Sequence, residues 1–206
     1  MKIDLRSLNE EFKDKNPSEI IQWVLKNYSK PLLTTNFRPY EIAIIYLCIL
    51  ENKNIDVLWC DTGYNTKEIY IYAENLIKNL KLNIHLYIPK QTREHRMALM
   101  GKVPSINDSD HKLFTEQVKL EPFRRAMAEI KPDAWITNLR RGQTNFRDSL
   151  DIFSMDDKGL IKISPFYYWS DKDLDIYMKE NNLINEYNYY DPTKVDDNRE
   201  CGLHLD

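Results

Sequence analysis

Short apolar segments alternate with longer segments of helical periodicity along this chain, and that alternation constrains the fold more than any other feature. Segments of strand character occupy residues 31–35, 55–60, 83–88, 134–137 and 160–163. Helical spacing or helix-start signals begin near residues 16, 42, 66, 113 and 170. Because strands that alternate with helices join through right-handed crossovers, we predict an α/β fold with a parallel sheet. The 206 residues are enough for one domain with a core of its own.

The polar segments that directly follow the strands are where we expect a functional site. They comprise residues 34–39, 61–64 and 138–147. In open parallel sheets, ligands bind at the carboxyl ends of the strands. These three segments are therefore expected to share one edge of the sheet.

Hydroxyl and amide side chains separate the first strand from the following helix, at Thr34, Thr35 and Asn36. Free N–H groups and the dipole at a helix N-terminus favour an anion there. The segment, with Phe37 and Arg38, is therefore a candidate phosphate loop. The alternative is an ordinary helix N-cap formed by Thr35 or Asn36.

An acidic residue, Asp61, follows the second strand and precedes Thr62 and Gly63. A carboxylate at this position can accept hydrogen bonds from a ribose. It can equally end the strand as a turn residue. The sequence leaves both interpretations open.

Three arginines and a glutamine lie close together after the fourth strand, at Arg140, Arg141, Gln143 and Arg147. Guanidinium groups match phosphate and sulfate oxygens in a bidentate manner. Together with Lys119, they indicate a basic pocket on a mildly acidic protein. The alternative is a solvated surface patch.

Cys201 is the candidate reactive thiol, because Arg199 and His204 can stabilise its thiolate. The alternative is an exposed cysteine without a role. Cys48 and Cys60 lie on an apolar helix face and at the end of an apolar strand, so we expect both to pack. Three cysteines cannot supply the four thiolates of an iron–sulfur cluster or a Cys₄ zinc site within one chain, so no metal is expected.

Charge and hydropathy exclude several classes of protein. The chain has 29 basic and 32 acidic residues, and the net charge of −3 is not that of a polybasic nucleic-acid binder. No apolar run approaches the roughly 20 residues that a membrane span needs. The polar start of the sequence has no secretory signal, so we expect a cytoplasmic protein.

The sequence ECGLH at residues 200–204 resembles the C-terminal signature of the sulfonucleotide reductases. These are the 3′-phosphoadenylylsulfate (PAPS) and adenylylsulfate (APS) reductases. Further segments resemble motifs of the same family in the same order: TTNF at 34–37, LWCDTGY at 58–64, KLEPFRRA at 119–126, LRRGQ at 139–143 followed by Arg147, and ISP at 163–165 followed by Trp169. The resemblance covers most of residues 30–206.

The resemblance implies a Rossmann-like parallel sheet of the adenine nucleotide alpha-hydrolase type. It divides the chain into a nucleotide-binding α/β domain, residues 1–184, and a C-terminal catalytic tail, residues 185–206. The implied catalytic residues are Cys201 and His204. The implied substrate-binding residues are Thr34, Thr35, Asn36, Phe37, Arg38, Asp61, Thr62, Gly63, Lys119, Arg140, Arg141, Gln143, Arg147 and Arg199.

The chemistry that the resemblance implies is attack of Cys201 on the sulfur of the substrate. This gives an S-sulfocysteine, from which thioredoxin or glutaredoxin frees sulfite. APS-type members carry extra cysteines that hold a [4Fe–4S] cluster. This chain lacks them, so PAPS is the expected substrate, without a bound cofactor or a cluster. A homodimer is left open.

The sequence departs from the family pattern at two places: Arg38 replaces a loop glycine, and residues 185–199 form a shorter stretch without glycine. Two other functions are therefore kept. One is a nucleotide enzyme of the ATP pyrophosphatase or adenylyltransferase type, whose usual S-G-G-x-D-S loop is absent from this sequence. The other is a non-catalytic nucleotide-binding relative, against which the presence of Cys201 and His204 argues.

Overall fold

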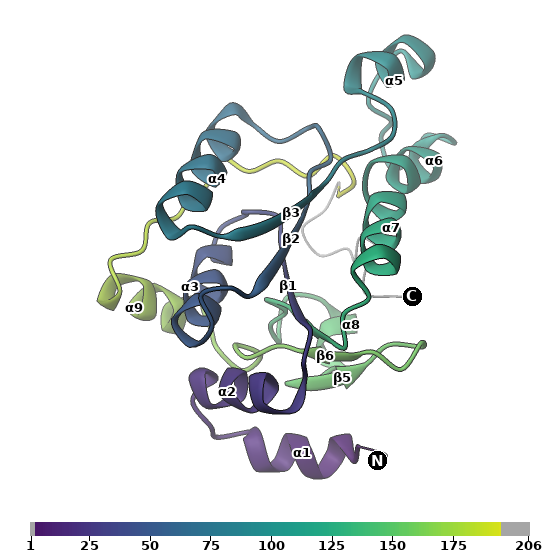
Figure 1. Ribbon diagram of the computed structural model, residues 1–206. Helices are drawn as coiled ribbons and strands as arrows, with labels where there is room; N and C mark the ends of the chain where they lie inside the picture. The colour runs from purple at the N-terminus through teal and green to yellow at the C-terminus, as the bar shows by residue number, and fades with distance from the viewer. Residues whose placement is uncertain (1–2, 195–206) are drawn as a thin grey trace.

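The computed structural model describes residues 3–194, and residues 1–2 and 195–206 lie outside the described part. Its centre is a six-stranded sheet with the strand order β3-β2-β1-β4-β6-β5 (Figure 1). The strands are β1 (Pro31–Thr35), β2 (Asp56–Cys60), β3 (Asn83–Tyr87), β4 (Ala134–Ile136), β5 (Phe153–Met155) and β6 (Ile161–Ile163). All neighbours are parallel except β5 and β6. The predicted α/β fold is confirmed, with one antiparallel strand added at the edge.

Helices connect the strands and cover both faces of the sheet (Figure 1). They are α1 (Leu5–Phe12), α2 (Pro17–Asn27), α3 (Glu41–Glu51), α4 (Lys67–Leu80), α5 (Arg93–Met100), α6 (His111–Thr115), the π-helical turn η1 (Glu116–Leu120), α7 (Glu121–Ile130), α8 (Asn145–Asp148) and α9 (Asp171–Glu180).

Side chains that alternate along β1 and β2 contribute to two apolar cores, one on each face of the sheet. Leu33 and Val57 belong to the main core, with side chains of α1, α2, α3, α4 and α9. Leu32 and Leu58 point to the opposite face, where they meet Ala126 and other residues of α7. Successive side chains of a strand point to opposite faces, so β1 and β2 are buried on both sides.

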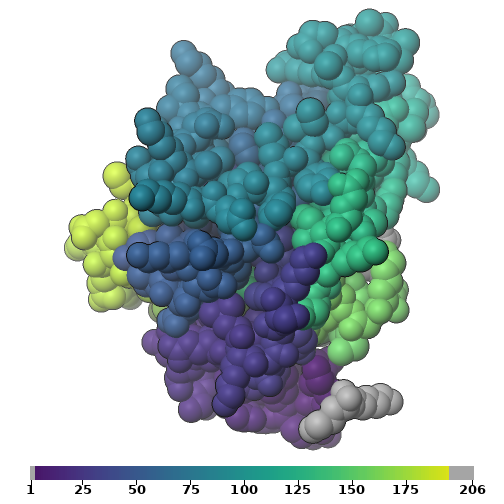
Figure 2. Space-filling model, viewed as in Figure 1, coloured from purple at the N-terminus to yellow at the C-terminus, as the bar shows by residue number. Residues whose placement is uncertain are grey.

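Four elements have no clear counterpart in the sequence prediction: α1, α5, the short helix α8 and strand β5. Helix α1 begins after Asp4, whose carboxylate accepts the N–H groups of Arg6 and Ser7. Helix α5 begins after Thr92, within residues 93–112, where the sequence shows no period. This part of the chain forms a lobe at the top right of Figure 2. Strand β5 (Phe153–Met155) is the antiparallel edge strand, and no strand was expected at these residues.

The single helix expected over residues 113–129 is interrupted by η1. Pro122 has no N–H to donate to the carbonyl of Val118, so the regular α-helical ladder cannot continue there. The N–H of Glu121 instead bonds the carbonyl of Glu116, five residues earlier. Lys119 lies in this wider turn, a local geometry that frequently marks functional sites.

Candidate active site

The three polar segments predicted at the strand ends lie around one crevice. Strand β1 is the centre of the sheet, with β2 on one side and β4 on the other. Chain connections leave β1 and β4 toward opposite sides, which opens a crevice at their carboxyl ends. The loops after β1, β2 and β4 border that crevice and carry most of the candidate residues.

The loop after β1 is held by its own side chains. Thr35 Oγ1 accepts the N–H of Phe37 at 3.1 Å, and Asn36 Oδ1 accepts the N–H of Arg38 at 3.3 Å. Neither side chain caps α3, because the residue at the N-cap is Tyr40. The capping alternative is therefore wrong for Thr35 and Asn36, which form local turns instead.

Phe37 and Tyr40 adopt left-handed backbone conformations, with φ of 55° and 69°. The phenyl ring of Phe37 is fully buried and packs edge-on against Trp59, with ring centroids 4.9 Å apart. The Phe37 side chain therefore lies in the core, so only its backbone can face a ligand. Arg38, which replaces the family glycine, does not have a positive φ. That position needs no glycine for its conformation, and the Arg38 side chain pairs with Glu41 at 3.1 Å.

Asp61 accepts hydrogen bonds from three groups of its own chain. Its carboxylate accepts the N–H of Gly63, the amide of Asn65 and the hydroxyl of Tyr70, each at 2.9 Å. Gly63 has φ of 80°, which a turn requires and glycine adopts without strain. These contacts are those of a turn residue. The Thr62 hydroxyl oxygen adds one more to the same turn, because it accepts the backbone N–H of Tyr64.

The three arginine side chains of the loop after β4 differ in their exposure to solvent. Arg140 and Arg147 are buried, whereas Arg141 is exposed. Gln143 Oε1 links them, because it accepts the backbone N–H of Arg140 and a guanidinium N–H of Arg147. Arg140 lies 5.4 Å from the ring centroid of Tyr40, which brings this loop to the loop after β1. Arg140, Gln143 and Arg147 therefore lie together, as the predicted basic pocket requires.

The guanidinium group of Arg140 is buried, but not every one of its N–H donors has an acceptor within residues 3–194. One Nη forms an ion pair with Asp171 at 2.6 Å, at the start of α9. Its Nε is buried and has no hydrogen-bond partner among the described residues. A buried guanidinium N–H normally has an acceptor, because leaving it without one is costly. An anion in the crevice is one group that would supply it.

Lys119 is held by the C-terminal part of the described chain. Its Nζ lies 2.6 Å from Asp191 Oδ2 and 3.2 Å from Thr193 Oγ1. Burial raises the pKa of Asp191, but the charge and hydrogen bonds of Lys119 and Thr193 outweigh it and hold the pKa below its usual value. The Asp191 carboxyl group is therefore ionised at neutral pH.

Residues 185–194 pack against the crevice. The amide of Asn36 donates to Tyr189 at 2.8 Å, and the N–H of Tyr40 donates to Asn185 at 2.8 Å. A cavity of only about 20 Å³ is left between these residues, Cys60 and Thr62. That space holds roughly one water molecule, so a nucleotide in this corner needs the segment to move. Tyr189 and Asp191 were not among the residues expected from the sequence, because nothing in the local pattern distinguishes them.

The two described cysteines are poor nucleophiles. Burial raises the pKa of the Cys60 thiol to about 12, although Arg125 and Lys119 act in the opposite direction. Burial also raises the pKa of the Cys48 thiol, which is fully enclosed in the main core. Both therefore stay protonated at neutral pH. The predicted residues Cys201, His204 and Arg199 lie outside the described residues.

Residues 3–194 hold neither a metal-binding cluster nor a membrane-spanning helix. No group of three His, Cys, Asp or Glu side chains there is placed to hold a metal ion. No helix in that part is long and apolar enough to cross a bilayer.

Comparison with known proteins identifies relatives of this chain. A family model described as "Phosphoadenosine phosphosulfate reductase domain" matches residues 30–189. A phosphoadenosine 5′-phosphosulfate reductase of Synechococcus is 28% identical, over 98% of this chain and 97% of the relative. One of Xylella fastidiosa is 31% identical, over 87% of this chain and 76% of the relative.

Solved structures show the same fold. A PAPS reductase of Candida auris, in a phosphate complex, superposes with a TM-score of 0.78 at 24% identity, covering 90% of each chain. An NH₃-dependent NAD synthetase of Campylobacter jejuni has a TM-score of 0.54 at 15% identity, covering 88% of this chain and 75% of that one. At these identities the likeness concerns the fold alone.

Proposed function

Because this chain belongs to the phosphoadenosine phosphosulfate reductase family, we propose that it reduces PAPS to sulfite and adenosine 3′,5′-bisphosphate. The observation that carries the proposal is the family match over residues 30–189, joined to relatives that align along nearly the whole chain. The crevice at the carboxyl ends of β1, β2 and β4 is the proposed substrate site. The activity belongs to sulfate assimilation.

The proposed reaction begins with the thiolate of Cys201. It attacks the sulfate sulfur of PAPS, forming an S–S bond and breaking the S–O bond to the phosphate. The electron pair of the broken bond leaves on the phosphate oxygen of adenosine 3′,5′-bisphosphate. Cys201 then carries an S-sulfo group, a covalent intermediate of the kind formed by activated cysteines. His204 and Arg199 are proposed to favour the thiolate and the leaving anion.

The cations of the crevice support the placement of the nucleotide anions. Arg38, Lys119 and Arg140 each face a carboxylate of this chain, at 3.1, 2.6 and 2.6 Å. A phosphate or sulfate oxygen can take the place of such a carboxylate oxygen, because the same cationic groups bind both kinds of anion. Cations fixed beside the phosphate stabilise the negative charge that develops on the leaving oxygen. Arg147, Arg141 and Gln143 extend this region along the loop after β4.

The loops after β1 and β2 are proposed to hold the rest of the nucleotide. The backbone of Thr34, Thr35, Asn36 and Phe37 borders the phosphates, and Asp61 with Thr62 and Gly63 borders the ribose. Residues 1–184 are the proposed nucleotide-binding domain, and residues 185–206 the tail that delivers Cys201.

Two electrons must enter to release sulfite, and we propose thioredoxin or glutaredoxin as their source. A thiolate of the donor attacks the sulfur of Cys201 and expels sulfite, and the second donor thiol resolves the mixed disulfide. The donor leaves as a disulfide, and Cys201 returns as a thiol. No bound cofactor or cluster is required by this scheme, and a reducing cytoplasm is the proposed compartment.

The test combines a mass measurement with an assay. Reduced protein is mixed with PAPS in the absence of a reductant, and intact-mass spectrometry with peptide mapping locates any added SO₃ group. We expect one group on Cys201, and none on Cys201→Ser. Sulfite release with reduced thioredoxin is then compared for PAPS and APS. Absence of the S-sulfo adduct during turnover, or sulfite release by the serine variant, would refute the mechanism, and preference for APS would refute the substrate.

A further inference from the structure

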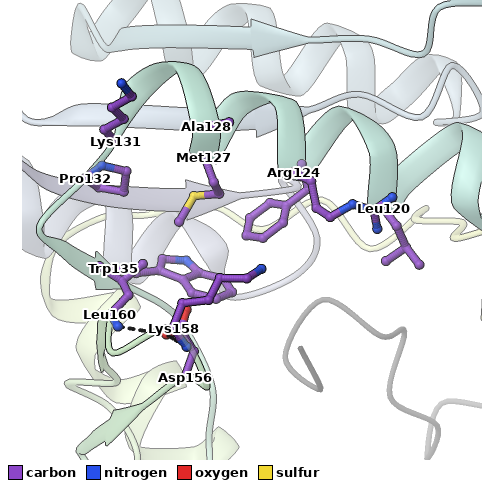
Figure 3. Close-up of a pocket in the computed structure, with 11 residues that line it drawn as sticks. Leu120, Arg124, Met127, Ala128, Lys131, Pro132, Trp135, Asp156, Lys158 and Leu160 are labelled. Carbon is purple, nitrogen blue, oxygen red and sulfur yellow. Dashed lines mark hydrogen bonds between the residues drawn. The ribbon is translucent and has the colours of Figure 1, made fainter.

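An apolar groove lies on the α7 side of the sheet, away from the crevice. It has a volume of about 460 Å³ and runs between α7 and the turn that joins β5 to β6 (Figure 3). Trp135 of β4 forms its floor, and its ring lies 5.0 Å from that of Phe123. Met127 and Ala128 line it from α7, and Leu160 lines it from the hairpin. Nothing in the reaction proposed above uses this groove.

The groove is open because α7 covers only part of the sheet. Its apolar side meets Leu32 and Leu58 on β1 and β2. Trp135 and Lys162, on the neighbouring strands β4 and β6, point to the same face, since they pair in register with Leu32 and with each other. The space beside α7 above Trp135 is therefore bounded by the β5–β6 turn instead of a second helix.

Basic side chains surround the apolar floor. Arg124, Lys131 and Lys158 line the groove together with one carboxylate, Asp156. Asp156 accepts the N–H groups of Lys158 and Leu160, which commits it to the hairpin turn. Within residues 3–194, neither Lys131 nor Lys158 forms an ion pair. A partner that presents apolar side chains with acidic ones around them complements this surface.

The groove begins beside the point where the described chain ends. Leu120 lines it, and the preceding residue, Lys119, holds Asp191 and Thr193. At about 1.5 Å per residue, the groove extends along α7 roughly 16 Å from Leu120 to Lys131. Six residues lie between Lys194 and Cys201, and the seven Cα–Cα steps from one to the other can span at most about 25 Å when extended. A protein seated in the groove is therefore within reach of Cys201.

We propose that this groove is the docking surface for the dithiol protein that reduces S-sulfocysteine 201, an inference that rests on the function proposed above. The partner presents an apolar surface around its reactive thiol and acidic residues outside it. Docking places the partner's thiolate beside the sulfur of Cys201. Its attack forms the mixed disulfide and releases sulfite with the electron pair of the S–S bond. The partner's second thiol then breaks the mixed disulfide, so two thiols become one disulfide with loss of two protons.

Ala128→Glu tests the groove directly. Ala128 is exposed on α7, so the substitution adds a charge to the groove without opening the core. Lys158→Glu reverses a charge of the rim in an exposed turn. Lys78→Glu makes the same reversal on exposed α4 and is the matched control. Thermal unfolding of each variant verifies that the fold is kept.

Formation of S-sulfocysteine and its reduction are measured separately, so that a defect in docking can be distinguished from a defect in chemistry. We expect the concentration of reduced thioredoxin that gives half-maximal sulfite release to rise at least about tenfold in Ala128→Glu and Lys158→Glu, and to stay unchanged in Lys78→Glu. S-sulfocysteine formation, and its reduction by dithiothreitol, should equal those of the wild type. Unchanged dependence on thioredoxin in both groove variants, or an equal loss with dithiothreitol, overturns the docking site. Failure of the wild type to form S-sulfocysteine overturns the proposed function and this inference with it.

Discussion

Asp191→Asn removes one charge from the most buried ion pair of the described chain. The side chains of Lys119 and Asp191 are 8% and 6% exposed, and their charged atoms are 2.6 Å apart. Breaking such a pair costs about 3–5 kcal/mol, because the buried Lys119 ammonium loses the opposite charge of Asp191 in a site with little water to replace it. The asparagine oxygen still accepts a hydrogen bond from Lys119, so we expect the lower value, about 3 kcal/mol. That is a factor of about 100 in an equilibrium constant.

The effect should appear as local opening of residues 185–194. This segment contacts the crevice through a few side chains, including Tyr189 and Asn185, and can detach without unfolding the sheet. Hydrogen exchange followed by mass spectrometry measures the opening, peptide by peptide. Protection of the peptide spanning 185–194 should fall about 100-fold in Asp191→Asn, while that of β1 and β2 stays the same.

The same experiment has a pH dependence of known sign. The pKa of Asp191 is lower in the folded protein than in the unfolded chain. Its stabilisation is therefore complete above the unfolded pKa, about 3.9, and is lost as pH falls through the lower folded pKa. The difference between wild type and variant, after correction for intrinsic exchange, should be full at pH 7 and shrink below about pH 4.

A second background serves as the control. In Lys119→Met there is no buried cation to leave unpaired, so adding Asp191→Asn should cost less than about 1 kcal/mol. An equal cost in both backgrounds would show that Asp191 acts through something other than Lys119. A difference that persists unchanged at low pH would refute the electrostatic reasoning itself.

Three further predictions concern other groups. Arg140→Ala should weaken binding of adenosine 3′,5′-bisphosphate by about 1.5–3 kcal/mol in isothermal titration. The free energy of unfolding should change by less than about 1 kcal/mol, because its ion-pair partner Asp171 is 65% exposed. Unchanged nucleotide binding with a large loss of stability would show that Arg140 has a structural role. Cys60, with a pKa of about 12, should resist iodoacetamide at pH 8 in the native protein, and peptide mapping that finds rapid alkylation would contradict the burial argument. Phe37→Ala should cost about 3–5 kcal/mol in urea unfolding, because it leaves a cavity beside Trp59, and a cost below about 1 kcal/mol would place the ring outside the core.

The strands and the position of the site could be predicted from the sequence alone. The apolar segment at residues 31–35 is strand β1 with the same bounds, and the segment at 55–60 contains β2 (Asp56–Cys60). Both are short segments rich in large apolar residues with polar residues on either side, a pattern that local composition determines. Parallel pairing then follows from the helices between them, and the site from the carboxyl ends of the strands. The family motifs were equally visible, because each is contiguous.

Only the tertiary structure determined which side chains meet. Lys119 pairs with Asp191, 72 residues away, and Asn36 bonds Tyr189, 153 residues away. Phe37, part of the phosphate-loop motif, proved to be a core residue. Periodicity reports how one segment presents its faces, whereas these contacts depend on where distant loops come to lie around the sheet. The groove has the same origin, because its walls come from α7, β4 and the β5–β6 hairpin, which come together only in the folded chain.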